Sequence, residues 1–171
     1  MDPRSLLRQF DIKPKKSLGQ NFLVDESAAE RIVAAADLSP DDLVLEVGPG
    51  LGALTRHLAV IAACVVAVEL DQRLIPVLQH TLAAYLNVKL VHGDILQLDP
   101  AHLLLNLNLS LNLSLNYKVV ANIPYYITSA LLRHLLEADV SPSLMVLTVQ
   151  EEVARRIVAS PGEMSLLALG V

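Results

Sequence analysis

The chain has 171 residues, 53% of them hydrophobic, so it is long and apolar enough for one α/β domain with a sizeable core and is not a disordered chain. Aromatic residues make up only 4% and tryptophan is absent, so the core has to consist mostly of Leu, Val, Ile and Ala. The formal net charge of −5 argues, on its own, against a general nucleic-acid-binding protein.

Positive charge is concentrated at the start of the chain. Five of the 13 Lys and Arg residues lie within the first 16 positions: Arg4, Arg8, Lys13, Lys15 and Lys16. A basic arm on an acidic body could contact phosphates, although from charge alone a solubilising tail is the favoured interpretation. We therefore assign residues 1–20 to a basic N-terminal arm and residues 21–171 to the folded domain.

Cysteine usage and hydropathy favour a cytoplasmic protein without membrane association. The single cysteine, Cys64, lies in an apolar run and is expected in the core, so a disulfide within the chain is excluded. The N-terminus has no apolar signal region, and no uninterrupted apolar run reaches the ~18 residues of a membrane span.

Helical and strand patterns alternate along the chain. The expected helices are residues 27–38 with Asp25 as N-cap, then 49–59, 71–86, 127–138 and 150–159. The expected strands are residues 43–48, 64–70, 88–94, 117–122 and 144–149. Continuous aliphatic strands are typical of parallel sheets that are buried on both faces. The alternation predicts an α/β fold with a doubly wound, mostly parallel sheet and a ligand at the carboxyl ends of its strands.

One low-complexity segment interrupts this alternation. Residues 103–116, LLLNLNLSLNLSLN, alternate Leu with Asn or Ser, and a period of two predicts an amphipathic strand or hairpin arm. The low complexity instead favours an inserted surface loop. Both interpretations stay open, and exposed leucines here could mediate self-association.

The Gly-rich turn after the first strand has the context of a nucleotide-binding motif. Gly48, Gly50 and Gly52 follow a strand and open a helix, and glycines let a ligand approach the backbone amides. Glu69 ends the next strand, where a carboxylate can accept hydrogen bonds from both hydroxyls of a ribose. Because Gly48, Gly50 and Ala53 also satisfy the dinucleotide fingerprint, an NAD-dependent oxidoreductase remains an alternative.

Two further carboxylates favour a different ligand. Glu46 lies just before the glycines, where a negative charge disfavours a pyrophosphate and suits a ligand with an ammonium and a sulfonium group. Asp94 ends the third strand and could accept a hydrogen bond from an adenine amino group, although a turn or helix-cap aspartate fits its spacing equally well. No His, Cys or Asp cluster has metal-ligand spacing and no nucleophile is paired with a base, so no metal is expected.

The fourth strand ends in the turn Asn122-Ile123-Pro124-Tyr125, beside the expected ligand site. The Asn122 side-chain carbonyl and backbone carbonyls of Ile123 and Pro124 could accept hydrogen bonds from an exocyclic amino group. Tyr125 could stack on a base lifted out of its strand. The alternative is a structural turn followed by two core tyrosines, and the position at the fourth strand favours the binding interpretation.

Together these motifs resemble the N-terminal domain of the KsgA-type ribosomal RNA adenine dimethyltransferases. The matching stretches cover roughly residues 13 to 162, in the order of the family: KKSLGQNFLVD, VLEVGPGLGALT, VVAVELD, VHGDIL, VVANIPYYIT and QEEVARRIV. The resemblance implies a Rossmann-like S-adenosylmethionine-dependent methyltransferase fold. It also implies an enzyme that transfers methyl groups from S-adenosylmethionine to N6 of two adjacent adenosines in a hairpin loop near the 3′ end of small-subunit rRNA.

The resemblance implies partners as well: small-subunit rRNA in the immature 30S particle, and hence RNA binding, rRNA processing and ribosome biogenesis. Two alternatives share the fold. One is a large-subunit rRNA adenine methyltransferase of the macrolide-resistance type, and the other is a non-catalytic RNA-binding ribosome-assembly factor. The oligomeric state stays open, with a monomer among the options.

The family's cofactor contacts can be carried over residue by residue. Asn21 and Leu23 would help to close over the cofactor, and the three motif glycines would pass under its methionine part. Glu69 would bind the ribose hydroxyls and Asp94 the adenine amine. From their positions at the ends of the first and fourth strands, we assign Glu46 and Asn122 to the cofactor site as well.

The family's target contacts fall on the turn after the fourth strand. Asn122, with the backbone of Ile123 and Pro124, would hold the target N6, and Tyr125 would stack on the target base. Family members usually continue with further strands and a small helical domain, whereas this sequence ends at Val171. We therefore expect a sheet truncated before its last strands and no C-terminal helical domain, with the insert at residues 103–116 as a second departure.

Overall fold

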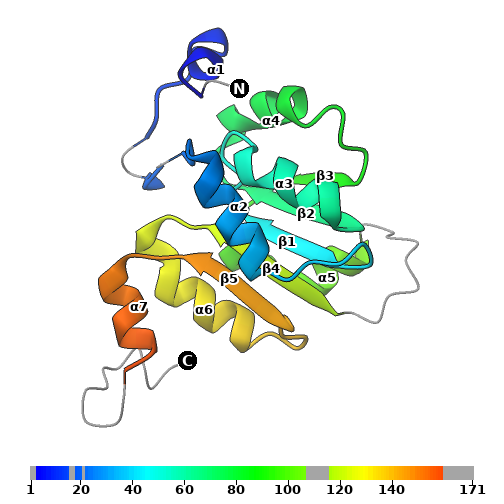
Figure 1. Cartoon of the computed structure of the whole chain (residues 1–171), viewed down its shortest axis with the longest axis vertical. Coiled ribbons are helices and arrows are strands. Elements are labelled where there is room, and N and C mark those ends of the chain that lie inside the picture. The colour runs from blue at the N-terminus through cyan, green and yellow to red at the C-terminus, as the bar shows by residue number, and fades with distance from the viewer. Residues whose placement is uncertain (1–2, 16–17, 21, 107–115, 160–171) are drawn as a thin grey trace.

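A computed structural model describes residues 3–15, 18–20, 22–106 and 116–159 (Figure 1). Its five strands form one sheet in the order β3-β2-β1-β4-β5, and every neighbouring pair is parallel. The strands are β1 Leu43–Val47, β2 Cys64–Glu69, β3 Val88–His92, β4 Tyr117–Asn122 and β5 Leu144–Thr148. The predicted parallel sheet is therefore confirmed.

Helices connect the strands and cover both faces of the sheet (Figure 1). The α-helices are α1 Pro3–Gln9, α2 Glu26–Ala35, α3 Ala53–Ile61, α4 Ile75–Thr81, α5 Pro100–Asn106, α6 Thr128–Leu136 and α7 Glu151–Ile157. Short 3-10 helices follow three of the strands: η2 Gln72–Leu74, η3 Ile95–Gln97 and η4 Tyr125–Ile127. The expected helix at residues 71–86 is thus divided into η2 and α4 and ends earlier, at Thr81.

The strands are buried on both faces, which explains their continuous aliphatic sequences. Along β1, Leu43 and Leu45 pack in a cluster with residues of α5 and α6, whereas Val44 packs in a second cluster with residues of α2 and α3. Each such side chain contributes roughly 1.5–3 kcal/mol of burial free energy. Cys64 belongs to the first cluster and is buried, as predicted.

The winding direction of the sheet reverses between β1 and β4, which are hydrogen-bonded neighbours. From β1, the chain proceeds through β2 and β3 on one side and through β4 and β5 on the other. The connections on the two sides diverge at this point, and they leave a crevice outside the carboxyl ends of the strands. The fold therefore has a cleft where the sequence analysis expects a ligand.

The N-terminal arm has more structure than its polar composition suggests. Residues of α1 form a short helix in which Leu6 is buried, and Ile12 packs in a cluster with Leu74 and Val77. A seven-residue helix is too short to show a clear apolar period, so the sequence pattern does not reveal it.

The Leu/Asn/Ser segment begins inside a helix. Its first residues, 103–106, form the end of α5, where Leu104 is buried in the core, so the strand interpretation is wrong for these residues. The reason lies upstream, because the Asp99 Oδ1 atom accepts hydrogen bonds from the amides of Ala101 and His102 and caps the helix. Residues 107–115 lie outside the described part of the chain. Among the described residues, no helix has both the length and the apolar character needed to cross a membrane.

Candidate active site

A cleft opens at the carboxyl ends of the central strands. Its walls come from residues 18–20 and 22–23 and from the turns that follow β1, β2, β3 and β4. The predicted site residues that line it are Leu23, Glu46, Gly48, Gly50, Glu69, Asp94, Asn122, Ile123, Pro124 and Tyr125. Gly52 is not part of the lining, and Asn21 lies outside the described residues.

Gly48 provides open backbone at the floor of the cleft. It has a φ of +70°, and its amide donates to the Val68 carbonyl at 2.9 Å, which ties the turn to the end of β2. A Cβ atom at this position would meet nothing within 4 Å. The backbone is therefore accessible to a ligand from the cleft side, as the motif predicts.

Gly52 has a packing role instead. It caps α3 with a φ of +81°, and a Cβ atom there would lie 3.1 Å from both Thr81 Oγ1 and Leu82 Cδ2. The glycine thus allows the start of α3 to approach the end of α4 closely. Its expected place under the cofactor stays a prediction that the cleft lining does not support.

Glu69 joins two turns of the site. Its side chain accepts a hydrogen bond from the Asp71 amide on Oε1 at 2.7 Å and from the Gly50 amide on Oε2 at 3.3 Å. Burial raises the pKa of this carboxyl above its usual value, and the two backbone amides offset part of that effect. Each oxygen keeps a lone pair that could accept a hydrogen bond from a ligand hydroxyl group in the cleft.

Glu46 is the most deeply buried carboxylate of the site, with 1% of its surface exposed. Burial raises the pKa of Glu46 to about 8, and the charge of Glu69 adds to this rise. The Thr55 hydroxyl is near enough to lower the pKa in part, yet neither Glu46 Oε2 nor Thr55 Oγ1 has a partner with good hydrogen-bond geometry among the described residues. A buried, unpartnered carboxylate oxygen at the edge of a cleft is suited to a cationic ligand.

Asp94 has the helix-cap role, one of the two that the sequence left open, and its role toward a ligand stays a prediction. Its Oδ1 atom accepts a hydrogen bond from the Leu96 amide at 3.0 Å and caps η3, as the helix-cap interpretation expects. The same residue lines the cleft, so Oδ2 remains for a ligand donor. The cap fixes the direction in which this carboxylate points.

Asn122 ends β4 opposite Thr148 of β5 in the parallel register. The Thr148 hydroxyl donates a hydrogen bond to Asn122 Oδ1, which orients the amide side chain. Sequence analysis missed Thr148, since only the strand register brings the two residues together.

The turn after β4 exposes its aromatic residues to the cleft and to solvent. Tyr125 and Tyr126 are 49% and 58% exposed, whereas Ile123 is buried. The interpretation of both tyrosines as core residues is therefore wrong. The Pro124 carbonyl already accepts a hydrogen bond from the Ile127 amide at 3.2 Å, and this contact fixes the start of η4.

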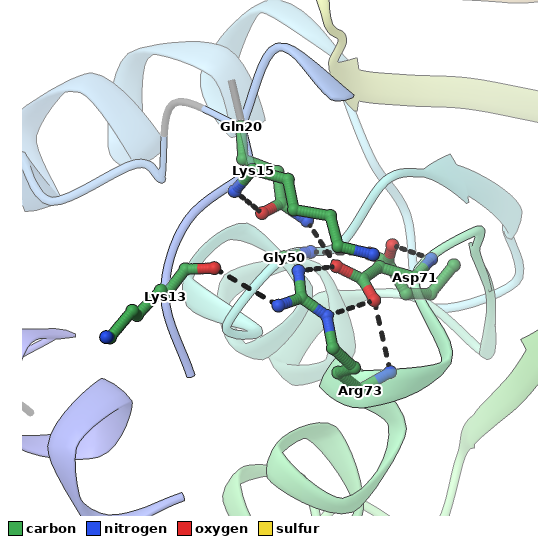
Figure 2. A network of polar contacts seen from close by, with 7 residues as sticks. Lys13, Lys15, Gln20, Gly50, Asp71 and Arg73 are labelled. Atoms are coloured by element: carbon green, nitrogen blue, oxygen red, sulfur yellow. Dashed lines mark hydrogen bonds and ion pairs between the residues drawn. The ribbon is translucent and has the colours of Figure 1, made fainter. Parts of the chain in front are cut away.

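A polar network beside the cleft was also missed from the sequence (Figure 2). The Asp71 carboxylate accepts hydrogen bonds from Arg73 Nε at 2.9 Å and from Gln20 Nε2 at 2.8 Å. The Arg73 guanidinium also donates to the Lys13 carbonyl at 3.2 Å. Residues 51 to 60 positions apart in sequence are joined here, and a local motif cannot signal such contacts.

In the described part of the chain, no group of three or more His, Cys, Asp or Glu residues could hold a metal ion. Carboxyl, amide and phenol side chains line the cleft together with backbone atoms: Glu46, Glu69, Asp94, Gln20, Asn122, Tyr125 and Tyr126. They suit an organic ligand that carries hydroxyl, amino and cationic groups.

Comparison with known proteins agrees with this geometry. The family model for ribosomal RNA adenine dimethylase matches residues 12–171. The ribosomal RNA small subunit methyltransferase A of Dehalococcoides mccartyi (strain CBDB1) is 48% identical over 98% of this chain and 55% of its own length. The protein of the same name from Natranaerobius thermophilus is 45% identical over 97% of this chain and 58% of its own length. The chain thus spans about half the length of the curated relatives that it matches.

Two solved structures are similar in fold and in sequence. The 23S rRNA methyltransferase ErmE superposes with a TM-score of 0.69 at 36% identity, over 85% of this chain and 54% of that one. A dimethyladenosine transferase from Plasmodium falciparum superposes with a TM-score of 0.68 at 28% identity, over 83% of this chain and 48% of that one. The fold is therefore that of the Rossmann-like methyltransferases, and the chain belongs to the ribosomal RNA adenine dimethylase family.

Proposed function

We propose that this chain is the catalytic domain of an S-adenosylmethionine-dependent rRNA adenine-N6 dimethyltransferase. Its reaction transfers methyl groups to two adjacent adenosines in a hairpin loop near the 3′ end of small-subunit rRNA. The observation that carries the proposal is the cleft in which Glu46, Glu69 and Asp94 lie on one side and the turn at Asn122 and Tyr125 on the other.

The donor side of the cleft fits S-adenosylmethionine. Glu69 would accept hydrogen bonds from the ribose hydroxyls and Asp94 from the adenine amino group, and the buried Glu46 carboxyl would compensate a positive charge once it has lost its proton. Gly48 and Gly50 would let the methionine part approach the backbone, and Leu23 would cover it. When bound, the donor supplies a methyl group already activated by the sulfonium.

The target side of the cleft holds the nucleophile. An aryl amine is a poor nucleophile because its lone pair is delocalised into the ring. Acceptors at Asn122 Oδ1 and at a carbonyl of Ile123 or Pro124 favour the pyramidal amine and free that lone pair. Tyr125 stacks on the flipped base, which is typically worth ~1–3 kcal/mol. Placement of the amine next to the methyl group then supplies much of the catalysis.

Small-subunit rRNA in the immature 30S particle is the proposed partner, with a role in ribosome biogenesis in the cytoplasm. The two small-subunit methyltransferases described above are 48% and 45% identical to this chain, compared with 36% for the 23S enzyme ErmE. The likeness to ErmE favours large-subunit rRNA as the second candidate substrate. The carboxylate Glu46 beside the glycines disfavours a pyrophosphate, and therefore NAD.

Methyl transfer measured separately from donor binding tests this function. Tritiated S-adenosylmethionine is offered with immature 30S particles, and immature 50S particles serve as the comparison. We expect transfer to the 30S particles and a loss of roughly 100-fold in Asn122→Ala, since a single positioned polar group typically contributes this much to catalysis.

Donor binding by calorimetry completes the test. We expect S-adenosylmethionine to bind and NAD not to bind. We also expect Glu69→Ala to weaken the binding of S-adenosylmethionine. Unchanged transfer in Asn122→Ala would remove the role assigned to that residue. Transfer to 50S particles alone would favour the large-subunit alternative, and donor binding without any transfer would favour the non-catalytic one.

A further inference from the structure

Residues 18–20 of the N-terminal arm form a wall that borders both halves of the cleft. On the target side the backbone of Gly19 lies against the turn after β4. A Cβ atom at Gly19 would be 3.1 Å from Pro124 Cβ and 3.4 Å from Tyr126 Cδ1. A displacement of this wall would therefore change the space next to the proposed target base.

On the donor side the same wall is tied to the end of β2. Gln20 Nε2 donates to Asp71 Oδ2 at 2.8 Å, and Gln20 Oε1 accepts from the Lys15 amide at 2.7 Å. The Asp71 amide in turn donates to Glu69 Oε1 at 2.7 Å. The hydrogen bond between Gln20 and Asp71 thus lies two residues along the chain from Glu69, the carboxylate proposed to bind the ribose.

Asp71 is itself held firmly. Its side chain is 3% exposed, and the Arg73 guanidinium pairs with both carboxylate oxygens while it also reaches the Lys13 carbonyl (Figure 2). The Arg73 guanidinium holds the pKa of Asp71 well below its usual range, so the carboxylate stays charged. A buried charge with several donors fixes its partners in place, because loss of any one leaves an incompletely paired charge.

We propose that Gln20, Asp71 and Arg73, here called the arm anchor, are positioning residues that hold residues 18–20 as a shared wall of the donor and target subsites. The affinity for the donor then depends on a contact that the donor itself does not make. The inference rests on the proposed function only for the identity of the donor.

The test compares three single variants of this chain. Gln20→Ala removes the hydrogen bonds to Asp71 and Lys15. Gln20→Glu keeps the size of the side chain but places a carboxylate against Asp71. Gln72→Ala is the matched control, because it makes the same amide-to-methyl change on an exposed side chain of the neighbouring η2 helix.

Two quantities are measured for each variant, together with the thermal midpoint as a check on the fold. The first is the rate of tryptic cleavage after Lys15 without any donor, and the second is the dissociation constant for S-adenosylmethionine by calorimetry. We expect about tenfold weaker donor binding in Gln20→Ala, as for the loss of one hydrogen bond to a charged group. The rate of tryptic cleavage should increase in the order wild type, Gln20→Ala, Gln20→Glu. Gln72→Ala should behave like the wild type in both measurements. The thermal midpoints of the wild type and the three variants should be similar.

The possible results separate the inference from the proposed function. Wild-type cleavage and affinity in Gln20→Glu would overturn the inference, because a side chain that only fills space tolerates this isosteric change. Faster cleavage with unchanged donor affinity would overturn it as well, since the wall would then not serve the donor subsite. Failure of the wild-type protein to bind S-adenosylmethionine contradicts the proposed function, while the cleavage rates still decide whether the arm anchor exists.

Discussion

At the scale of single residues, Glu46 gives the site its most unusual electrostatic property. Its carboxyl is buried beside a second carboxylate, and its pKa rises from 4.5 to about 8. The folded protein therefore keeps a proton on Glu46 at pH values where the unfolded chain has lost it. Because the folded state binds more protons in this window, the free energy of unfolding falls as pH rises from about 4.5 to about 8.

Replacement of Glu46 by glutamine removes this titration. We expect Glu46→Gln to show a smaller loss of unfolding free energy between pH 5 and pH 9 than the wild type, with the difference between the two largest near the upper end. Urea denaturation of the ligand-free protein across this range measures the effect. Glu30→Gln, which changes an exposed glutamate of α2, should retain the wild-type slope. Equal slopes for Glu46→Gln and the wild type would show that Glu46 does not titrate in this window.

The residues of the site differ in how readily the sequence reveals them. Glu46, Glu69 and Asp94 each end or nearly end a strand, so their shared edge follows from the parallel topology. Gln20 and Thr148 could not be found in this way. Their roles come from contacts across 51 and 26 positions, and these depend on how the arm and the last strand are placed.

At the scale of elements, the pairing of β4 with β5 decides the orientation of the proposed catalytic amide. The register sets Thr148 beside Asn122, and the threonine hydroxyl donates to the amide oxygen. With its oxygen held, the amide cannot easily turn its NH₂ group toward an incoming amine. The strand pair therefore fixes the acceptor before the target base arrives.

Loss of the threonine hydroxyl should affect catalysis more than binding. We expect Thr148→Val, which keeps the shape of the side chain, to lower the rate constant of methyl transfer by roughly tenfold, as for one lost hydrogen bond. Donor affinity should stay within about twofold of the wild type by calorimetry. Ser143→Ala is the control, because it removes a hydroxyl that donates to the Tyr117 carbonyl near the other end of the same strand pair. Equal losses in both variants would indicate a general effect on the sheet.

The turn between β1 and α3 allows a paired prediction for two glycines. Both have a positive φ, so alanine at either position costs on the order of 1 kcal/mol of stability. The Cβ of Gly48→Ala would point into the open cleft, whereas the Cβ of Gly52→Ala would press on Thr81 and Leu82. We therefore expect Gly48→Ala to lose donor binding with a modest change in stability.

Gly52→Ala should show the reverse pattern. It should be the less stable of the two in urea denaturation, because its Cβ meets packed atoms at 3.1 Å, and it should keep more of its donor affinity. A loss of donor binding in Gly52→Ala with unchanged stability would place this glycine in the cofactor site after all.

At the scale of the whole molecule, the sequence predicts the sheet well because its signals are local and repeated. Each strand is a short aliphatic run, and each is followed by a helical period, which together specify a parallel doubly wound sheet. Two other segments, α1 and the end of α5, behave differently. Helix α1 is too short for its sequence to show a helical apolar period. Helix α5 extends into a repeat whose period of two suggests a strand.

The floor and the wall of the cleft differ in how easily they can be displaced. The floor consists of β1 and β4, which lie in the middle of the sheet with a hydrogen-bonded strand on each side, so its displacement would require the sheet to come apart. The wall at residues 18–20 is held by the side-chain hydrogen bonds of Gln20, so its displacement would not require the sheet to come apart. Under the proposed function, the demethylated donor should accordingly leave the cleft on the side of residues 18–20. Under the proposed function, the rate of turnover would then have an upper limit set by how often residues 18–20 move away from the cleft, independent of the rate of methyl transfer.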